Sequence, residues 1–263
     1  YGFFMNLFPD NHLTHRYVSF GLGLYLLLIL NKVFSFFIND KLIVLRTILF
    51  ISLLEYFVLS SHISRAEMLG ASVVFTAFYI FIKDNKIVNY ILGSFLLGLA
   101  FDIHLASLIG VFLFFGYEIA SKRFSFKNYK LYTLTILIFL VGTSVWIFTH
   151  YNEIDKVIDG YSLLQSAVIE ANFLDRFTFL YDIGMKSRFY RHFIFLIIFV
   201  LSTILFFILK SKLDKKIINL YYIFIISFIG YMLLGRTSIF YLLYFFPILY
   251  LFFICVLHKI KFG

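Results

Sequence analysis

Nine apolar runs, separated by short polar segments, follow one another along this 263-residue chain. A helix needs about 20 apolar residues to cross the hydrocarbon core of a bilayer, and most of the runs approach that length. Only helices and closed barrels satisfy their backbone in lipid, and no period-two alternation indicates a barrel. The sequence therefore predicts an all-α polytopic membrane protein with about nine transmembrane helices. We place them at residues 17–36, 42–59, 68–82, 87–103, 105–119, 131–149, 193–209, 217–234 and 239–257.

The composition agrees with a chain that is embedded throughout. Hydrophobic residues make up 62% and charged residues only 14%, whereas soluble domains are about one quarter charged. No linker divides the sequence, so we expect a single transmembrane domain over residues 1–263. The lone Cys255 excludes an internal disulfide. A protein this apolar offers no credible surface for nucleic acid, and its excess of basic residues is explained by membrane topology.

Basic residues are unevenly divided between the two predicted sides. The loops after spans one, three, five, seven and nine hold 14 of the 23 lysines and arginines, and the opposite side holds 8. By the positive-inside rule the first set is cytoplasmic, together with the C-terminus. Residues 1–16 then form an outer boundary segment, and residues 150–191 form an outer loop. The outer set is mostly arginine, which either binds an anionic ligand or serves in helix caps and salt bridges.

Ionisable and polar residues gather at the predicted outer ends of several spans. At that depth such residues indicate a binding cavity. For Arg65 and Glu67, capping of the helix that begins there is an alternative role. No phosphate-binding loop, hydrolase motif or metal-ligand spacing is present. The candidate site residues are Arg16, His62, Arg65, Glu67, Asp102, His104, Arg236 and Tyr241.

Four stretches resemble a known family. They are residues 1–8 with His15-Arg16-Tyr17-Val18-Ser19; Ser64-Arg65-Ala66-Glu67; Gly98-Leu99-Ala100-Phe101-Asp102-Ile103-His104; and Arg236-Thr237-Ser238-Ile239-Phe240-Tyr241 followed by Pro247. Their order resembles the GT-C glycosyltransferases that use lipid-phosphate sugars, in the protein O-mannosyltransferase and aminoarabinose-transferase branch. Ala66 departs from the proline of that family.

The resemblance implies a GT-C-like bundle that transfers a sugar from a polyprenyl-phosphate carrier to a protein, lipid or glycan acceptor on the outer face. In the family the catalytic carboxylate lies in the first outer loop. We therefore expect that loop, the helix before it and the catalytic residue to lie upstream of Tyr1. His104 takes the position of a lysine or histidine near the lipid phosphate, and Arg16, Arg65 and Arg236 become candidates for phosphate or sugar contacts. No cofactor is required, although a divalent metal is compatible with this chemistry.

Two other classes of function stay open. A transporter or flippase for a lipid-linked or anionic solute would be favoured by helices broken at matching positions in two halves, and the sequence shows neither a repeat nor paired breaks. A non-catalytic membrane subunit would lack an acidic residue in the upstream loop. The sequence upstream of Tyr1 separates this last class from the enzyme.

Overall fold

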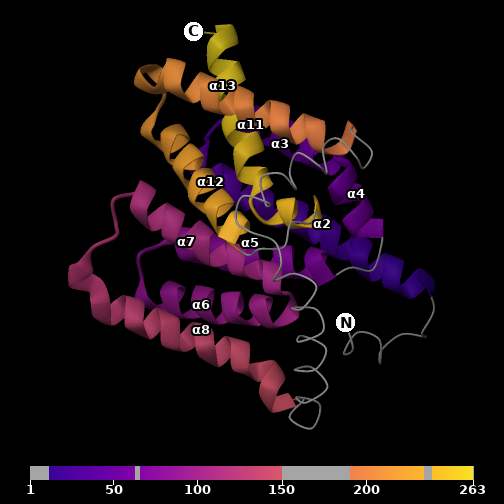
Figure 1. Ribbon diagram of the computed structural model, residues 1–263, viewed down its shortest axis with the longest axis vertical. Helices are drawn as coiled ribbons and strands as arrows, with labels where there is room; N and C mark the ends of the chain where they lie inside the picture. Colours follow the sequence, from indigo (N-terminus) through magenta and orange to yellow (C-terminus); the bar gives the residue numbers. More distant parts are fainter. Residues whose placement is uncertain (1–11, 63–65, 150–189, 234–238, 263) are drawn as a thin grey trace.

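Every element in the described part of the chain is helical, as the sequence predicts. A computed structural model describes residues 12–62, 66–149, 190–233 and 239–262, and no strand occurs among them (Figure 1). The helices are α2 (His12–Phe37), α3 (Lys41–Ser52), α4 (Glu55–His62), α5 (Ala66–Lys83), α6 (Ile87–Ile103), α7 (Ile109–Ala120), α8 (Tyr129–Thr149), α11 (Tyr190–Leu209), α12 (Lys215–Leu233) and α13 (Phe246–Phe262). Short 3₁₀ turns are η1 (Leu105–Leu108), η2 (Phe126–Asn128), η4 (Lys210–Lys212) and η5 (Ile239–Tyr244).

Five helices of this part are long and apolar enough to cross a membrane, or six if one bent pair counts as a single span. This supports a multi-pass membrane protein. The predicted count of nine full spans is not confirmed, because three of the predicted segments form apolar helices of only 10–17 residues. The five qualifying segments are Arg16–Phe37, Ala66–Lys83, Phe126–Val145, Phe195–Lys212 and Lys215–Leu233.

The second predicted span, residues 42–59, is not one continuous helix. It is divided into α3 and α4, which meet at an angle of 63°. At the break the backbone tightens into three-residue turns, with Leu53 N donating to Phe50 O and Leu54 N donating to Ile51 O. The Ser52 hydroxyl also donates to the carbonyl of Leu49 at 2.8 Å. Neither proline nor glycine marks this position, so the apolar pattern alone predicts a straight span.

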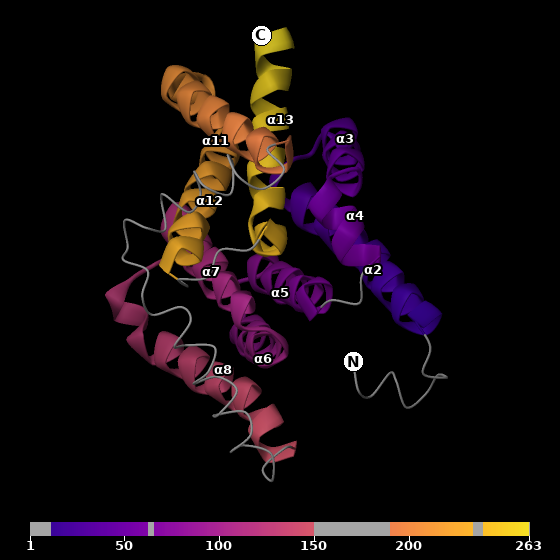
Figure 2. The same ribbon diagram turned by 45° about the vertical axis from the view of Figure 1, so that its right-hand side comes forward.

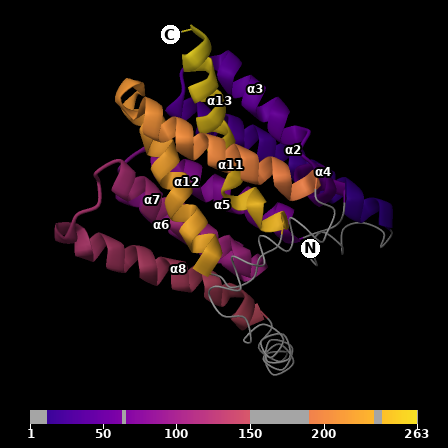
Figure 3. The ribbon, with the colours of Figure 1, turned by 45° about the horizontal axis from the view of Figure 1, so that its top comes forward.

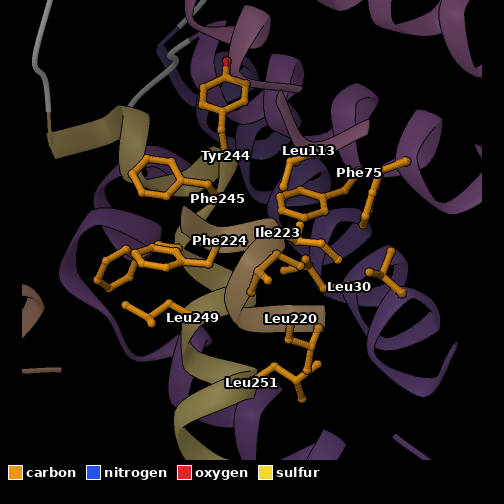
Figure 4. Close-up of a cluster of buried hydrophobic side chains, with 14 of the residues drawn as sticks. Leu30, Phe75, Leu113, Leu220, Ile223, Phe224, Tyr244, Phe245, Leu249 and Leu251 are labelled. Carbon is orange, nitrogen blue, oxygen red and sulfur yellow. The ribbon is translucent and has the colours of Figure 1, made fainter. Parts of the chain in front are cut away.

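The C-terminal segment forms the centre of the core, although it comes last in the chain. Phe245, Leu249 and Leu251 are fully buried. They pack with side chains from α12, α2, α5 and α7, as Figure 4 shows for Phe224, Leu30, Phe75 and Leu113 among others. Helix α11 lies across α13 and adds ring contacts, including Phe195 with Phe246 at 4.2 Å between centroids (Figure 3).

The basic loops of the predicted cytoplasmic side lie together at one end of the bundle, here called the basic end. The ring of Tyr117, near the end of α7, contacts Phe36 and Phe37 at the end of α2 and Phe81 at the end of α5. Lys216 at the start of α12 donates to the carbonyl of Phe36 at 3.2 Å. These contacts join the ends of helices that an up-and-down arrangement predicts to be neighbours.

Helix α8 packs mainly on α6, and the two run side by side (Figures 1 and 2). Their closest approach is at two glycines. A Cβ atom on Gly98 would collide with the carbonyl of Phe139 and would lie 2.9 Å from Gly142 Cα. A Cβ atom on Gly142 would lie 2.5 Å from the carbonyl of Phe95. Small residues at such a seam allow backbones to touch in a membrane, where dispersion and packing drive helix association.

We predict that Gly98→Ala destabilises the protein by about 1–3 kcal/mol, because the added methyl group must push α6 and α8 apart. Gly21→Ala is the matched control, since a Cβ atom there meets nothing within 4 Å. That control should be neutral or stabilising by up to about 1 kcal/mol through helix propensity. The measurement is the free energy of unfolding in mixed detergent micelles. Equal effects of the two substitutions would contradict a close seam between α6 and α8.

Candidate functional site

Three of the candidate residues meet at the end of the bundle that carries the N-terminus of α5. Glu67 lies in the first turn of α5 and is buried, with 4% of its surface exposed. His104 directly follows α6, and its Nε2 atom lies 3.8 Å from Glu67 Oε1. Tyr241 of η5 places its ring edge-on to the imidazole, 5.3 Å between centroids. The structure thus brings together three of the eight residues that the sequence predicts at the outer ends of the spans.

Two further side chains of the described residues belong to the group. The phenol ring of Tyr244 lies nearly parallel to the imidazole of His104, with an interplanar angle of 15° and 6.4 Å between centroids. Its hydroxyl lies 3.3 Å from Ser107 Oγ of η1. We call Glu67, His104, Ser107, Tyr241 and Tyr244 the Glu–His cluster. Its members come from α5, the α6–η1 junction and η5, which are far apart in the sequence.

The local backbone fixes the orientation of the His104 ring. His104 is extended, with φ −159° and ψ 126°, and it caps the N-terminus of η1. Its Nδ1 atom accepts a hydrogen bond from the amide of Ala106 at 3.2 Å. Because Nδ1 accepts, the proton of the neutral ring must be on Nε2, which is the nitrogen that faces Glu67. The sequence thus builds an imidazole with a defined tautomer and a defined direction.

Gly70 makes room for the tyrosine of the cluster. A Cβ atom at this position would collide with the hydroxyl of Tyr244 and would lie 2.8 Å from Ser107 Oγ. Tyr244 is fully buried, and in Figure 4 its hydroxyl points away from the other labelled core side chains. The hydroxyl of Tyr244 is held by Ser107, and its ring lies parallel to the imidazole, so this tyrosine supports the orientation of His104 by packing.

The burial of Glu67 has a physical requirement. A carboxylate removed from water is costly unless charge or hydrogen bonds compensate it. Its position in the first turn of α5 is favourable, because the N-terminus of a helix carries a partial positive charge. The imidazole Nε2 lies 3.8 Å from the carboxylate, within ion-pair distance but longer than a hydrogen bond. Of the pair, His104 is the more accessible, with 19% of its side chain exposed against 6% for Glu67. A ligand would therefore meet His104 first.

The remaining predicted residues have different environments. Arg16, near the start of α2, and His62, at the end of α4, are exposed. Asp102 is partly buried in the last turn of α6, two residues before His104. Arg65 and Arg236 lie outside the described residues, so their predicted roles stay predictions. In the sequence, Arg65 precedes Glu67 by two residues and Arg236 precedes Tyr241 by five.

Sequence reasoning missed Tyr244, Ser107 and Gly70. Two spacings could have indicated the first two, because Tyr244 follows Tyr241 by three residues and Ser107 follows His104 by three. Both spacings suit one turn of a 3₁₀ helix, which repeats every three residues. Gly70 leaves no comparable pattern in the sequence.

Within the described ranges no group of three or more histidine, cysteine, aspartate or glutamate side chains is arranged to hold a metal ion.

No protein-family model, curated protein or solved structure matches this chain. Functional inference therefore depends on the residues and on the geometry of the Glu–His cluster.

We predict that Ser107→Ala and Tyr244→Phe are energetically coupled. Each single substitution removes the same hydrogen bond, so each should cost about 1 kcal/mol of unfolding free energy, more if a partner is left unsatisfied. The double variant should cost about as much as one single variant, which gives a coupling energy of roughly 1 kcal/mol. Unfolding of the four proteins in mixed micelles measures this cycle. Strict additivity would show that the two hydroxyls do not interact.

Proposed function

We propose that this protein is a membrane glycosyltransferase that moves a sugar from a polyprenyl-phosphate carrier to an acceptor on the outer face of the membrane. The Glu–His cluster would form one wall of the cavity for the sugar phosphate. The observation that carries the proposal is the orientation of His104. Its ring is oriented by the cap on η1, and its side chain is 19% exposed, against 6% for Glu67.

In the proposed reaction the hydroxyl oxygen of the acceptor attacks the anomeric carbon of the sugar. The bond from that carbon to the phosphate oxygen breaks, and the polyprenyl phosphate leaves with the electron pair. Donors directed at the leaving phosphate would stabilise its growing charge, and such donors contribute strongly in a site that excludes water. His104 suits this role, with Arg65 and Arg236 as further candidates from neighbouring sequence. The acceptor proton would go to a carboxylate that acts as general base.

Glu67 would act through His104 as a positioning residue. It is too deeply buried to be the first group that a substrate meets, and its carboxylate faces the nitrogen that carries the imidazole proton. A carboxylate in that place favours an imidazole ring that keeps its Nε2 proton while the polyprenyl-phosphate sugar binds.

The proposal also includes nine membrane crossings in a GT-C-like bundle, with the basic end and the C-terminus in the cytoplasm. It includes a protein, lipid or glycan acceptor, and it requires no cofactor.

A transporter or flippase of a lipid-linked solute is the second candidate. One observation favours it, namely the 63° break between α3 and α4, because transporters often build their sites from discontinuous helices. Reconstituted vesicles that contain a labelled polyprenyl-phosphate sugar separate the two functions. Formation of a new glycosidic bond supports the enzyme. Movement of intact carrier between leaflets without any product would support the transporter instead.

We predict that His104→Asn in the full-length protein lowers sugar transfer by about 10²–10³-fold, the usual effect of removing one charge-stabilising donor. Asparagine can still cap η1 through its side-chain oxygen, so the fold should be kept. It cannot reproduce the Nε2–H. The measurement is the initial rate of product formation at matched expression and matched elution from a sizing column. His104→Ala should lose both the cap and the activity.

Arg236→Ala should abolish transfer in the same assay without loss of expression. Wild-type rates in both His104→Asn and Arg236→Ala would overturn the proposed role of this end of the bundle.

A further inference from the structure

A second candidate site lies at the basic end, remote from the Glu–His cluster. The α2–α3 connection, the start of α12 and the last turns of α13 enclose a cavity of about 490 Å³. Part of its lining is apolar and includes Phe37, Ile43 and Ile217. Another part is contributed by three lysines, Lys215, Lys216 and Lys259.

The charges that line this cavity are not balanced. Asp214 forms an ion pair with Lys259 at 3.3 Å. Asp40 uses a carboxylate oxygen to cap α3, where it accepts from the amides of Leu42 at 2.8 Å and Ile43 at 3.2 Å. Both carboxylates of the lining are therefore engaged. His258 also contributes to the lining.

Three lysines against two aspartates leave the lining with one net positive charge, and Lys215 and Lys216 are the two lysines outside the ion pair of Asp214. Lys216 donates to the carbonyl of Phe36 at 3.2 Å, which holds the side chain in place without neutralising it. Lys215 is exposed at the first position of α12. Within the described part of the chain, neither ammonium group lies within ion-pair distance of a carboxylate. The N-terminus of the 19-residue helix α12 adds to the positive potential at the same place.

We propose that this cavity binds a phosphate-bearing anion, with Lys215 and Lys216 contacting the phosphate oxygens. Lysine is well suited to this because it is a compact charge with three donors. The apolar part of the lining fits the glycerol and first acyl carbons of a membrane lipid, and the basic end is where helix ends would meet lipid headgroups. This site is independent of the glycosyltransferase proposal. A lipid headgroup and a soluble phosphate share the recognised chemistry.

The test is isothermal titration of the full-length protein in a neutral maltoside detergent with three probes. They are dioctanoyl phosphatidic acid, dioctanoylglycerol, which lacks the phosphate, and inorganic phosphate. The double variant K215Q/K216Q should bind dioctanoyl phosphatidic acid about 25-fold more weakly, since each lysine close to an anionic lipid contributes roughly fivefold. The control K127Q/K130Q removes the same charge from two exposed lysines of the same predicted membrane side and should leave the affinity unchanged.

Competition by inorganic phosphate would identify a soluble phosphate as a sufficient ligand. Binding of phosphatidic acid without such competition would identify the lipid headgroup as the ligand. Equal affinity of dioctanoylglycerol and dioctanoyl phosphatidic acid would overturn the proposal, and so would equal losses in the two double variants. A double variant that fails to fold is recognised by its elution profile. The single substitution K215Q at the exposed position then replaces it, and it should lower the affinity for dioctanoyl phosphatidic acid about fivefold.

Discussion

A buried carboxylate facing an imidazole is the interaction on which the proposed site depends. Glu67 and His104 approach to 3.8 Å inside a bundle whose buried residues are mostly apolar. In such surroundings an uncompensated charge is costly, so the helices that carry the two groups must be held in register. The parallel ring of Tyr244, its contact with Ser107 and the space left by Gly70 provide that support. One glycine and two hydroxyls therefore support the position of His104.

The two ends of the bundle carry different side chains. The basic end collects lysines that agree with the positive-inside rule, and it also contains a cavity in which two ammonium groups lack a carboxylate partner among the described residues. The opposite end holds the Glu–His cluster. Between them, the fully buried side chains of α13 and α12 form a dry core, to which α2, α5 and α7 contribute (Figure 4).

Much of the helical arrangement could be predicted from the sequence, because long apolar runs have few alternatives in lipid. Grouping Glu67, His104 and Tyr241 at one end also followed from counting spans. The break between Ser52 and Glu55 could not be predicted, since a backbone turn stabilised by a serine hydroxyl leaves the apolar pattern intact. Tyr244 was missed for a related reason. In a run as aromatic as residues 240–246, only packing distinguishes a support for His104 from an ordinary core side chain.

The tautomer of His104 is the most direct test of the proposed site. Nitrogen-15 NMR of histidine-labelled full-length protein in nanodiscs measures it, with His104→Asn used to assign the signal. We expect the neutral ring to carry its proton on Nε2, and we expect the Nε2 resonance to shift when polyprenyl phosphate is added. A ring protonated on Nδ1, or an Nε2 signal that polyprenyl phosphate leaves unchanged, would contradict the role of His104 at the lipid phosphate.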